Sequence, residues 1–254
     1  MHWVEQFYSR QYELMPELCN GEVTDTHRKN ACIIRRLAGG RTGRVLDLGA
    51  GGGQNASALA DMGYSVVAIE LVPSGAEHAR KLASQPHVGE LRVIEGDFYS
   101  TELPGQFVIV CYWDGFGIGS DKDQHRLLKR IAGWLSPAGF AVIEIYTPWY
   151  WAGVAGREMR FGRAVRRYGF DHENCRMLDR WWPAGHMEQS VTQSLRCYSP
   201  EDLKNILRGT GLKLESVESR GMYDHERERF VEHVPLDQAM QYLARLVPED
   251  GRDF

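Results

Sequence analysis

The feature that most constrains the fold is the stretch 44–54, in which an apolar run ends in alternating glycines. The run closes at Leu48, and Gly49, Gly51 and Gly53 follow it. A helical spacing of apolar residues begins directly afterwards, so the stretch predicts a strand, a tight turn and a helix. Glycine permits left-handed backbone and leaves no side chain where a ligand approaches the turn. The stretch therefore predicts a ligand-binding unit.

Two acidic residues stand at the ends of the next two strand-like segments. Glu70 closes the apolar run 65–69, and Asp97 follows the run 91–94. A carboxylate at the end of a second strand can accept hydrogen bonds from both ribose hydroxyls of a nucleoside. A carboxylate at the end of a third strand can accept one from an adenine amino group. The two residues together predict a nucleoside site.

The glycine pattern departs from the dinucleotide fingerprint Gly-x-Gly-x-x-Gly, because Gln54 stands where the third glycine would fall. With Asp47 before the glycines, and Glu70 and Asp97 after them, residues 27–147 resemble the class I S-adenosylmethionine-dependent methyltransferases. The resemblance implies that the glycine loop holds the methionine moiety of the cofactor S-adenosyl-L-methionine. The cofactor product of methyl transfer is then S-adenosyl-L-homocysteine. The expected cofactor-binding residues are Asp47, Gly49, Gly51, Gly53, Glu70, Leu71, Asp97, Phe98 and Trp113.

Strand-like and helix-like segments alternate along most of the chain, which predicts an α/β fold. The expected architecture is a Rossmann-like, mostly parallel seven-stranded sheet with helices on both faces. Near-continuous apolar runs such as 107–111 indicate strands that are buried on both sides. A turn at Pro137–Gly139 is expected to lead into the strand 140–146. The segment 239–247 fits a strand or a helix, and the resemblance favours an antiparallel seventh strand.

Residues 148–198 interrupt this alternation with aromatic residues, glycines and seven arginines between Arg157 and Arg180. They predict an antiparallel β cap over the carboxyl edge of the sheet, with 189–198 as its longest strand. The segment 224–232 is expected to be charged and solvated. The expected domains are a helical lid (1–38), the cofactor-binding core (39–147), the cap (148–198) and the rest of the core sheet (199–254).

Composition excludes several classes of protein. A net charge of −4 provides no general nucleic-acid footprint. Five scattered cysteines without a Cys-x-x-Cys pair argue against a disulfide framework or zinc site and fit a reducing cytoplasm. We expect no metal, because no cluster has metal-ligand spacing. We expect no signal peptide, because the N-terminus has no basic segment followed by an apolar one. We also expect no membrane span, because no apolar run approaches the ~20 residues that one needs.

Methyl transfer from a sulfonium requires chiefly an in-line nucleophile at about 3 Å with water excluded. An amine attacks without a general base if its pocket favours the neutral form, whereas a hydroxyl usually needs one. Asp114 is the one carboxylate in the loop after the fourth strand, and it fits either a base or an Asp-Gly turn. No histidine is clearly placed for acid–base work. The sequence therefore favours an amine acceptor and leaves oxygen and carbon acceptors open.

Aromatic residues supply the remaining site candidates. The N-terminal helix 3–15 carries Tyr8 and Tyr12, which fit either a lid over the cofactor or a helix docked on the core. The expected catalytic residues are Tyr8 and Phe116. The expected substrate-binding residues are Tyr12, Asp114, Phe116, Trp149 and Arg176. The helix, the loop and the cap resemble small-molecule methyltransferases of bacterial secondary metabolism, including sugar and lincosamide-type antibiotic N-methyltransferases.

Two other classes of function stay open at this stage. Arginines at positions 157, 160, 163, 166 and 167 would suit an RNA methyltransferase, although acidic residues among them favour a solvated or self-paired face. The domain would also suit a non-catalytic, cofactor-binding regulator. The expected partner is a small-molecule acceptor, without nucleic acid or membrane, and the sequence leaves a homo-oligomer open.

Overall fold

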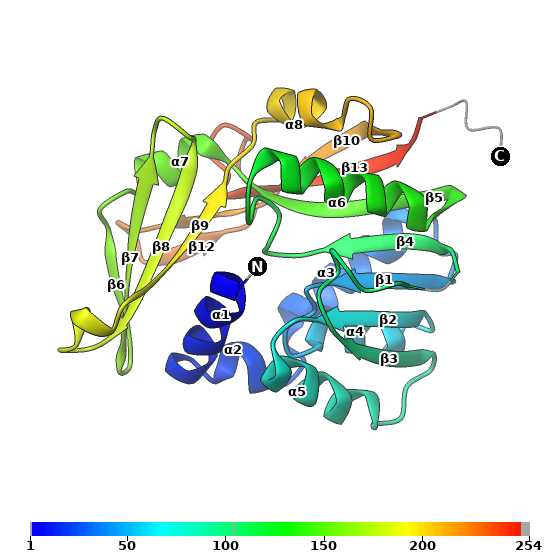
Figure 1. The fold of residues 1–254 in the computed structure, drawn as a ribbon, viewed down its shortest axis with the longest axis horizontal. Coiled ribbons are helices and arrows are strands. Elements are labelled where there is room, and N and C mark those ends of the chain that lie inside the picture. Colours follow the sequence, from blue (N-terminus) through cyan, green and yellow to red (C-terminus); the bar gives the residue numbers. More distant parts are fainter. Residues whose placement is uncertain (1, 104, 250–254) are drawn as a thin grey trace.

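The protein is built around one twisted seven-stranded sheet (Figure 1). The structure, a computed structural model, describes residues 2–103 and 105–249. Met1 and residues 250–254, which the expected lid and C-terminal segment include, lie outside the described residues. Within the described ranges, no helix combines the length and the apolar character that crossing a bilayer requires.

The sheet has the order β10-β13-β5-β4-β1-β2-β3. Its strands are β1 (Arg44–Leu48), β2 (Ser65–Glu70), β3 (Glu90–Glu95), β4 (Phe107–Tyr112), β5 (Leu135–Tyr146), β10 (Leu212–Ser219) and β13 (Gln241–Pro248). β13 runs antiparallel to both of its neighbours, and the other pairs are parallel. The predicted fold class and the antiparallel seventh strand are confirmed.

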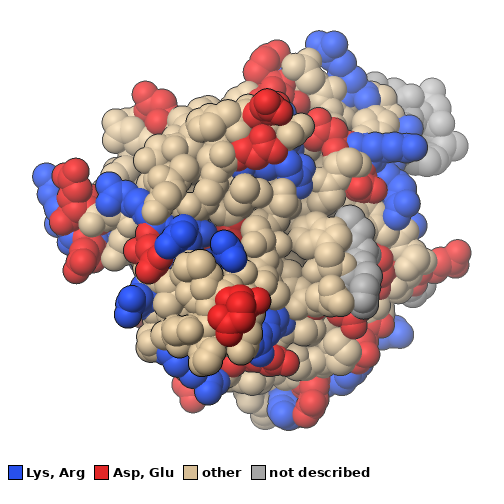
Figure 2. All heavy atoms as spheres, turned by 60° about the vertical axis from the view of Figure 1, so that its left-hand side comes forward, with Lys and Arg blue, Asp and Glu red and all other residues tan. Residues whose placement is uncertain are grey.

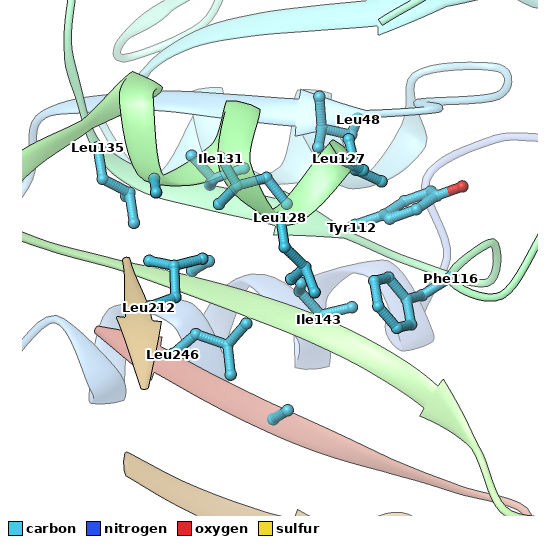
Figure 3. Close-up of a cluster of buried hydrophobic side chains, with 14 of the residues drawn as sticks. Leu48, Tyr112, Phe116, Leu127, Leu128, Ile131, Leu135, Ile143, Leu212 and Leu246 are labelled. Carbon is cyan, nitrogen blue, oxygen red and sulfur yellow. The ribbon is translucent and has the colours of Figure 1, made fainter. Parts of the chain in front are cut away.

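Helices cover both faces of the sheet because successive strand residues point to opposite sides. Leu46 and Leu48 of β1 belong to the cluster that contains the buried stripe of α6. Val45 belongs to the cluster that contains α3 and α4. The helices are α3 (Asp25–Leu37), α4 (Gln54–Asp61), α5 (Pro73–Ala83), α6 (Asp121–Trp134) and α8 (Pro200–Leu207). Figure 3 shows Leu127, Leu128 and Ile131 of α6 gathered with Leu48 and Ile143 of the sheet.

The cap is a separate four-stranded antiparallel sheet of order β6-β7-β8-β9. The segment contains α7 (Pro148–Gly153), β6 (Glu158–Phe161), β7 (Ala164–Asp171), β8 (Arg176–Pro183), the 3₁₀ turn η1 (Met187–Gln189) and β9 (Val191–Arg196). The expectation that 189–198 is the longest strand is wrong. β9 has 6 residues and β7 and β8 have 8 each, because η1 occupies the start of the expected strand.

One other local expectation is corrected. β5 begins at Leu135 rather than at residue 140, and the predicted turn at Pro137 lies within the strand. The ladder accommodates it with a register shift, in which Phe107 pairs with Leu135 and Ile109 pairs with Phe140. The charged segment 224–232 contributes to a hairpin of β11 (Met222–Asp224) and β12 (Arg229–Val231). Most of the segment is exposed, as its charges predicted.

The N-terminal helix α1 (His2–Leu14) and the short α2 (Glu17–Asn20) lie between the cap and the carboxyl edge of the core sheet (Figure 1). Three hydrogen bonds join α1 to the cap. Gln193 Nε2 donates to the Tyr8 hydroxyl at 2.7 Å, Arg10 donates to Gln189 at 3.0 Å, and Arg163 donates to the Glu13 carbonyl at 3.2 Å. The helix therefore closes the space between the two sheets.

Phe116 follows β4 and lies in the core rather than at a surface. The residue is 0% exposed and belongs to the buried cluster of Figure 3. Its ring centroid lies 5.5 Å from that of Tyr198. We predict that Phe116→Ala lowers the free energy of unfolding by about 3–5 kcal/mol, as large-to-small core substitutions do. Phe230→Ala, at a position 56% exposed, should change it by less than ~0.5 kcal/mol. Urea unfolding measures both, and equal effects would contradict this core assignment.

Candidate active site

A cavity of about 520 Å³ opens at the carboxyl ends of β1, β2, β3 and β4. Its walls come from the glycine loop, the acidic strand ends, α1, α3 and the inner face of the cap. The volume lies within the ~300–1,000 Å³ range of small-molecule sites. The carboxyl edge is where open α/β sheets bind ligands. The cavity is therefore the candidate active site.

The glycine loop forms one end of the cavity. Gly49 and Gly51 have φ of 60° and 57°, left-handed values that other residues rarely adopt. A Cβ on Gly52 would lie 1.8 Å from the carbonyl oxygen of Cys19 in α2. The backbone at these three positions lines the cavity without side chains. The loop thus offers a bare backbone cradle of the kind that a bulky ligand needs.

Glu70 links this loop to the next helix. Its Oε2 accepts from the Gly51 amide at 2.7 Å, and its Oε1 accepts from the Val72 amide at 2.8 Å. Burial raises the pKa of Glu70 to about 7, although the two amide hydrogen bonds oppose the shift. Each carboxylate oxygen has a second lone pair, so Glu70 can hold the loop and still accept from a ligand hydroxyl.

Asp97 and Phe98 follow β3 and line the same end of the cavity, as Leu71 does after β2. Asp97 Oδ1 accepts from the Tyr99 amide at 2.7 Å, which fixes the turn. The Phe98 ring meets Tyr112 edge-on, with centroids 5.5 Å apart. The aromatic and acidic groups predicted for a nucleoside thus lie together beside the glycine loop.

The other end of the cavity is aromatic and acidic. Tyr8, Trp113 and Asp114 line it as predicted, together with Trp181 of the cap. Tyr12 also lines the cavity, but its hydroxyl lies beside the glycine loop, 3.4 Å from a Cβ built on Gly51. The indole Nε1 atoms of Trp113 and Trp181 are buried and have no hydrogen-bond partner within the described ranges. A buried donor without a partner is costly, so both indoles are available to a ligand acceptor.

Charged pairs brace this end. Arg166 of β7 donates two hydrogen bonds of 2.7 Å to Asp179, and its guanidinium stacks on Tyr168 at 4.5 Å and Trp181 at 4.9 Å. Glu144 of β5 accepts from Arg220 at 3.3 Å and from the backbone amide of Asp114. Burial raises the pKa of Glu144 to about 6, while Arg220 lowers it.

Two expected cofactor residues lie behind the cavity wall. Asp47 is 0% exposed in β1, and neither carboxylate oxygen has a hydrogen-bond partner among the described residues. Burial and the neighbouring charge of Glu70 raise its pKa to about 8. Gly53 caps α4 with φ of 84°, and a Cβ there would lie 2.6 Å from the Ala79 side chain. Gly53 therefore allows α4 and α5 to pack closely.

Three expected substrate or catalytic residues do not line the cavity, and their assignment is corrected. Phe116 packs in the core beneath the loop. Trp149 begins α7, outside the cavity lining. Arg176 donates to the Gly117 carbonyl at 3.2 Å and to Ser194, so its guanidinium ties the cap to the loop. Arg176 also alternates with the inward-facing Met177, which turns it to the outer side of β8.

Sequence reasoning missed several cavity residues. Glu144 interrupts an otherwise apolar, buried strand. Because burying an unpaired carboxylate is costly, such a residue indicates a polar partner or a ligand nearby. Arg166 and Trp181 are cross-strand partners whose common face depends on the cap register. His27 also lines the cavity, but its Nδ1 accepts from the Thr24 amide at 3.0 Å and caps α3. Of these residues, only Glu144 could have been predicted from the sequence without knowing the fold.

Comparisons with known proteins agree with this geometry. Residues 23–217 match the model of a family described as a methyltransferase domain. A 106-residue segment is 32% identical to the mitochondrial ubiquinone biosynthesis O-methyltransferase of Schizosaccharomyces pombe, covering 41% of this chain. The match spans only about a third (36%) of that curated relative.

Solved structures share the fold. The CcbJ methyltransferase of Streptomyces caelestis has a TM-score of 0.68 at 20% identity, covering 87% of this chain and 89% of its own. CalS10 of Micromonospora echinaspora, an amino pentose methyltransferase solved with S-adenosylmethionine bound, has a TM-score of 0.60 at 18% identity. That match covers 94% of this chain and 95% of CalS10.

The sheet order, the glycine loop and the two acidic strand ends define a class I methyltransferase fold with a nucleoside site. The chain belongs to the S-adenosylmethionine-dependent methyltransferases of the methyltransferase-domain family. The cradle fits that cofactor, because backbone alone lines Gly49, Gly51 and Gly52, and Glu70 and Asp97 lie at its rim. Among the described residues, no group of three His, Cys, Asp or Glu side chains could hold a metal ion.

The position of Glu70 predicts its contribution to cofactor affinity. Glu70→Ala should weaken S-adenosylmethionine binding by about 10- to 100-fold, because it removes a charged acceptor and releases the Gly51 amide. Asp97→Ala should act in the same direction but more mildly. Glu95→Ala on the adjacent strand removes an exposed carboxylate outside the cavity lining and should leave affinity unchanged. Calorimetry measures all three, and an unaltered dissociation constant for Glu70→Ala would refute the ribose assignment.

Asp47 predicts a pH dependence of stability. Its pKa is raised from 3.8 to about 8 in the folded chain, so folding favours the protonated form. The stabilisation is complete below about pH 4 and is lost as pH rises through about 8. Between about pH 6 and 8 the free energy of unfolding should therefore fall as pH rises. Asp47→Asn should make this decrease less steep, by up to ~1.4 kcal/mol per pH unit. Urea unfolding of the cofactor-free protein tests this, and Asp237→Asn is the exposed control. Parallel profiles for Asp47→Asn and the unaltered protein would contradict it.

Proposed function

We propose that this protein methylates an amine nitrogen of a small molecule of secondary metabolism. The observation that carries the proposal is the carboxylate of Asp114 in the cavity wall. Among the described residues, no arginine or lysine forms an ion pair with it, since Arg166, the cation that faces it, pairs with Asp179. A cavity carboxylate that forms no ion pair within the protein favours a ligand that brings a positive charge.

The aromatic walls support the same class of acceptor. Tyr8, Tyr12, Trp113 and Trp181 enclose the space beside Asp114. Aromatic faces attract ammonium groups and exclude water from the site of transfer. The likeness in fold to an amino pentose methyltransferase involved in calicheamicin biosynthesis is consistent with a natural-product amine.

The residues divide the work between the two ends of the cavity. The glycine loop, Glu70 and Asp97 would hold the cofactor, which when bound supplies an electrophilic methyl group on its sulfonium. Asp114 would bind the acceptor nitrogen, and the aromatic walls would fix its approach. Such positioning accounts for most of the acceleration in a displacement of this kind.

The arginines of the cap do not support an RNA acceptor. Arg166 pairs with Asp179, Arg167 pairs with Glu158 at 2.7 Å, and Arg163 binds the α1 backbone. Figure 2 shows acidic and basic side chains interspersed on the face that includes the cap. Because these arginines bind other groups of the protein, they do not form a uniformly positive surface for phosphates on the cap.

The test is methyl transfer from isotopically labelled S-adenosylmethionine to amino sugars, cyclic secondary amines, phenols and transfer RNA, followed by mass spectrometry. We expect labelled methyl on amine nitrogen, with little dependence on salt. Transfer only to phenols or RNA would contradict the proposal. Cofactor binding without transfer to any of these acceptors would instead favour a cofactor-binding regulator.

Tyr8 provides a prediction about acceptor handling. Tyr8→Phe removes the hydroxyl that accepts from Gln193 but keeps the ring. We expect the acceptor KM or kcat to change by about threefold to tenfold, the value of one neutral hydrogen bond. The melting temperature should fall by only ~2–4 °C. A loss of several kcal/mol of stability with normal activity per folded molecule would make Tyr8 a core residue.

A further inference from the structure

Asp114 is held in a fixed and unusual conformation. It has φ of 52°, the left-handed region, and it is followed by Gly115. The Tyr112 hydroxyl donates to the Gly115 carbonyl at 2.8 Å, and Gln124 accepts from the Gly117 amide at 3.1 Å. These bonds hold the loop directly after Asp114 in place. A non-glycine residue in this region persists only where its surroundings impose it, often at functional sites.

The partner of Asp114 is a buried phenol at the end of β5. The Tyr146 hydroxyl donates to Asp114 Oδ1. The Tyr146 ring stacks on Trp151, with centroids 5.0 Å apart and planes at 30°, so the phenol is held rigidly. The hydrogen bond occupies one carboxylate oxygen and leaves Oδ2 for a ligand. Asp114 is therefore presented to the cavity as a single oriented acceptor.

The other ionisable groups around Asp114 are neutral phenols or are paired with an opposite charge. Tyr8, Tyr12 and Tyr112 face it from α1 and β4, and burial raises the pKa of each phenol well above its usual range. Glu144 is engaged by Arg220 and by the Asp114 amide. Arg166 faces it from the cap, paired with Asp179. Asp114 is thus the carboxylate best able to exchange a proton with a bound acceptor.

We propose that Asp114 is the proton acceptor in methyl transfer and that Tyr146 is the residue that positions it. This inference rests on the proposed amine acceptor. A bound ammonium gives one N–H proton to Asp114 Oδ2, the N–H bond breaks, an O–H bond forms, and the nitrogen keeps the electron pair with which it attacks. The proton leaves Asp114 to solvent after product release. Desolvation in the cavity supports the step because it raises the pKa of Asp114, while Tyr146 and Arg166 lower it.

The experiment compares Asp114→Asn and Tyr146→Phe with two matched controls outside the cavity lining, Asp237→Asn and Tyr150→Phe. The substrate is the amine that the unaltered protein methylates fastest in the panel described above. Asp114→Asn should lower kcat/KM by about 100-fold or more, in the range of general-base catalysis, and abolish the acidic limb of its pH profile. Tyr146→Phe should keep that limb but move it to higher pH, because losing the donor raises the pKa of Asp114. S-adenosylmethionine affinity should stay within threefold for all four variants.

A second measurement does not need an acceptor. The ¹³Cγ resonance of Asp114 in aspartate-labelled protein, assigned with Asp114→Asn, should titrate above the usual aspartate range, and higher still in Tyr146→Phe. An Asp114 that titrates in the usual aspartate range and does not respond to Tyr146→Phe would overturn the pair. Activity of Asp114→Asn within threefold of the unaltered protein would overturn the proton acceptor. If the unaltered protein methylates no amine, the proposed function fails instead, and the proton step from an ammonium falls with it.

Discussion

The site depends first on one carboxylate that joins two loops. Glu70 ends β2 and accepts from the amides of Gly51 and Val72, so it holds the turn after β1 against the start of α5. The parallel register of β1 and β2 places it there, since Leu48 pairs with Ile69. Without that bond the left-handed backbone at Gly51 would lack its main support. The carboxylate that holds the glycine loop is therefore positioned by the core sheet.

The acceptor end is assembled differently, from three parts of the chain that are distant in sequence. The loop after β4 supplies Asp114, the N-terminal helix supplies Tyr8, and the cap supplies Trp181. Paired charges, Arg166 with Asp179 and Glu144 with Arg220, brace these parts without placing a free cation beside Asp114. Buried pairs of this kind contribute more to a defined geometry than to stability. They leave the cavity acidic where the acceptor nitrogen is proposed to bind.

The sequence predicted the core well because local patterns determine it. Near-continuous apolar runs and the glycine turn at 49–53 each indicate their own local structure. The cap was predicted as antiparallel, but which residues face inward depends on strand register, which turns and tertiary pairing set. For that reason Arg176 was placed in the site and Arg166 was not. The assignment of Phe116 to the site was wrong for a related reason. An aromatic side chain in a loop can turn toward the core or toward the cavity, and the sequence does not decide which.

The bond between Tyr8 and Gln193 has a consequence for how the molecule is made. The two residues are 185 positions apart, so α1 leaves the ribosome long before the cap that holds it. The sheet from β1 to β5 and the cradle beside it lie between them in the chain. Contacts of such long sequence separation form late, because loop closure is costly until intervening segments are ordered. A chain interrupted before residue 193 would carry a cofactor cradle open to solvent, and the enclosed chamber is a property only of the finished polypeptide.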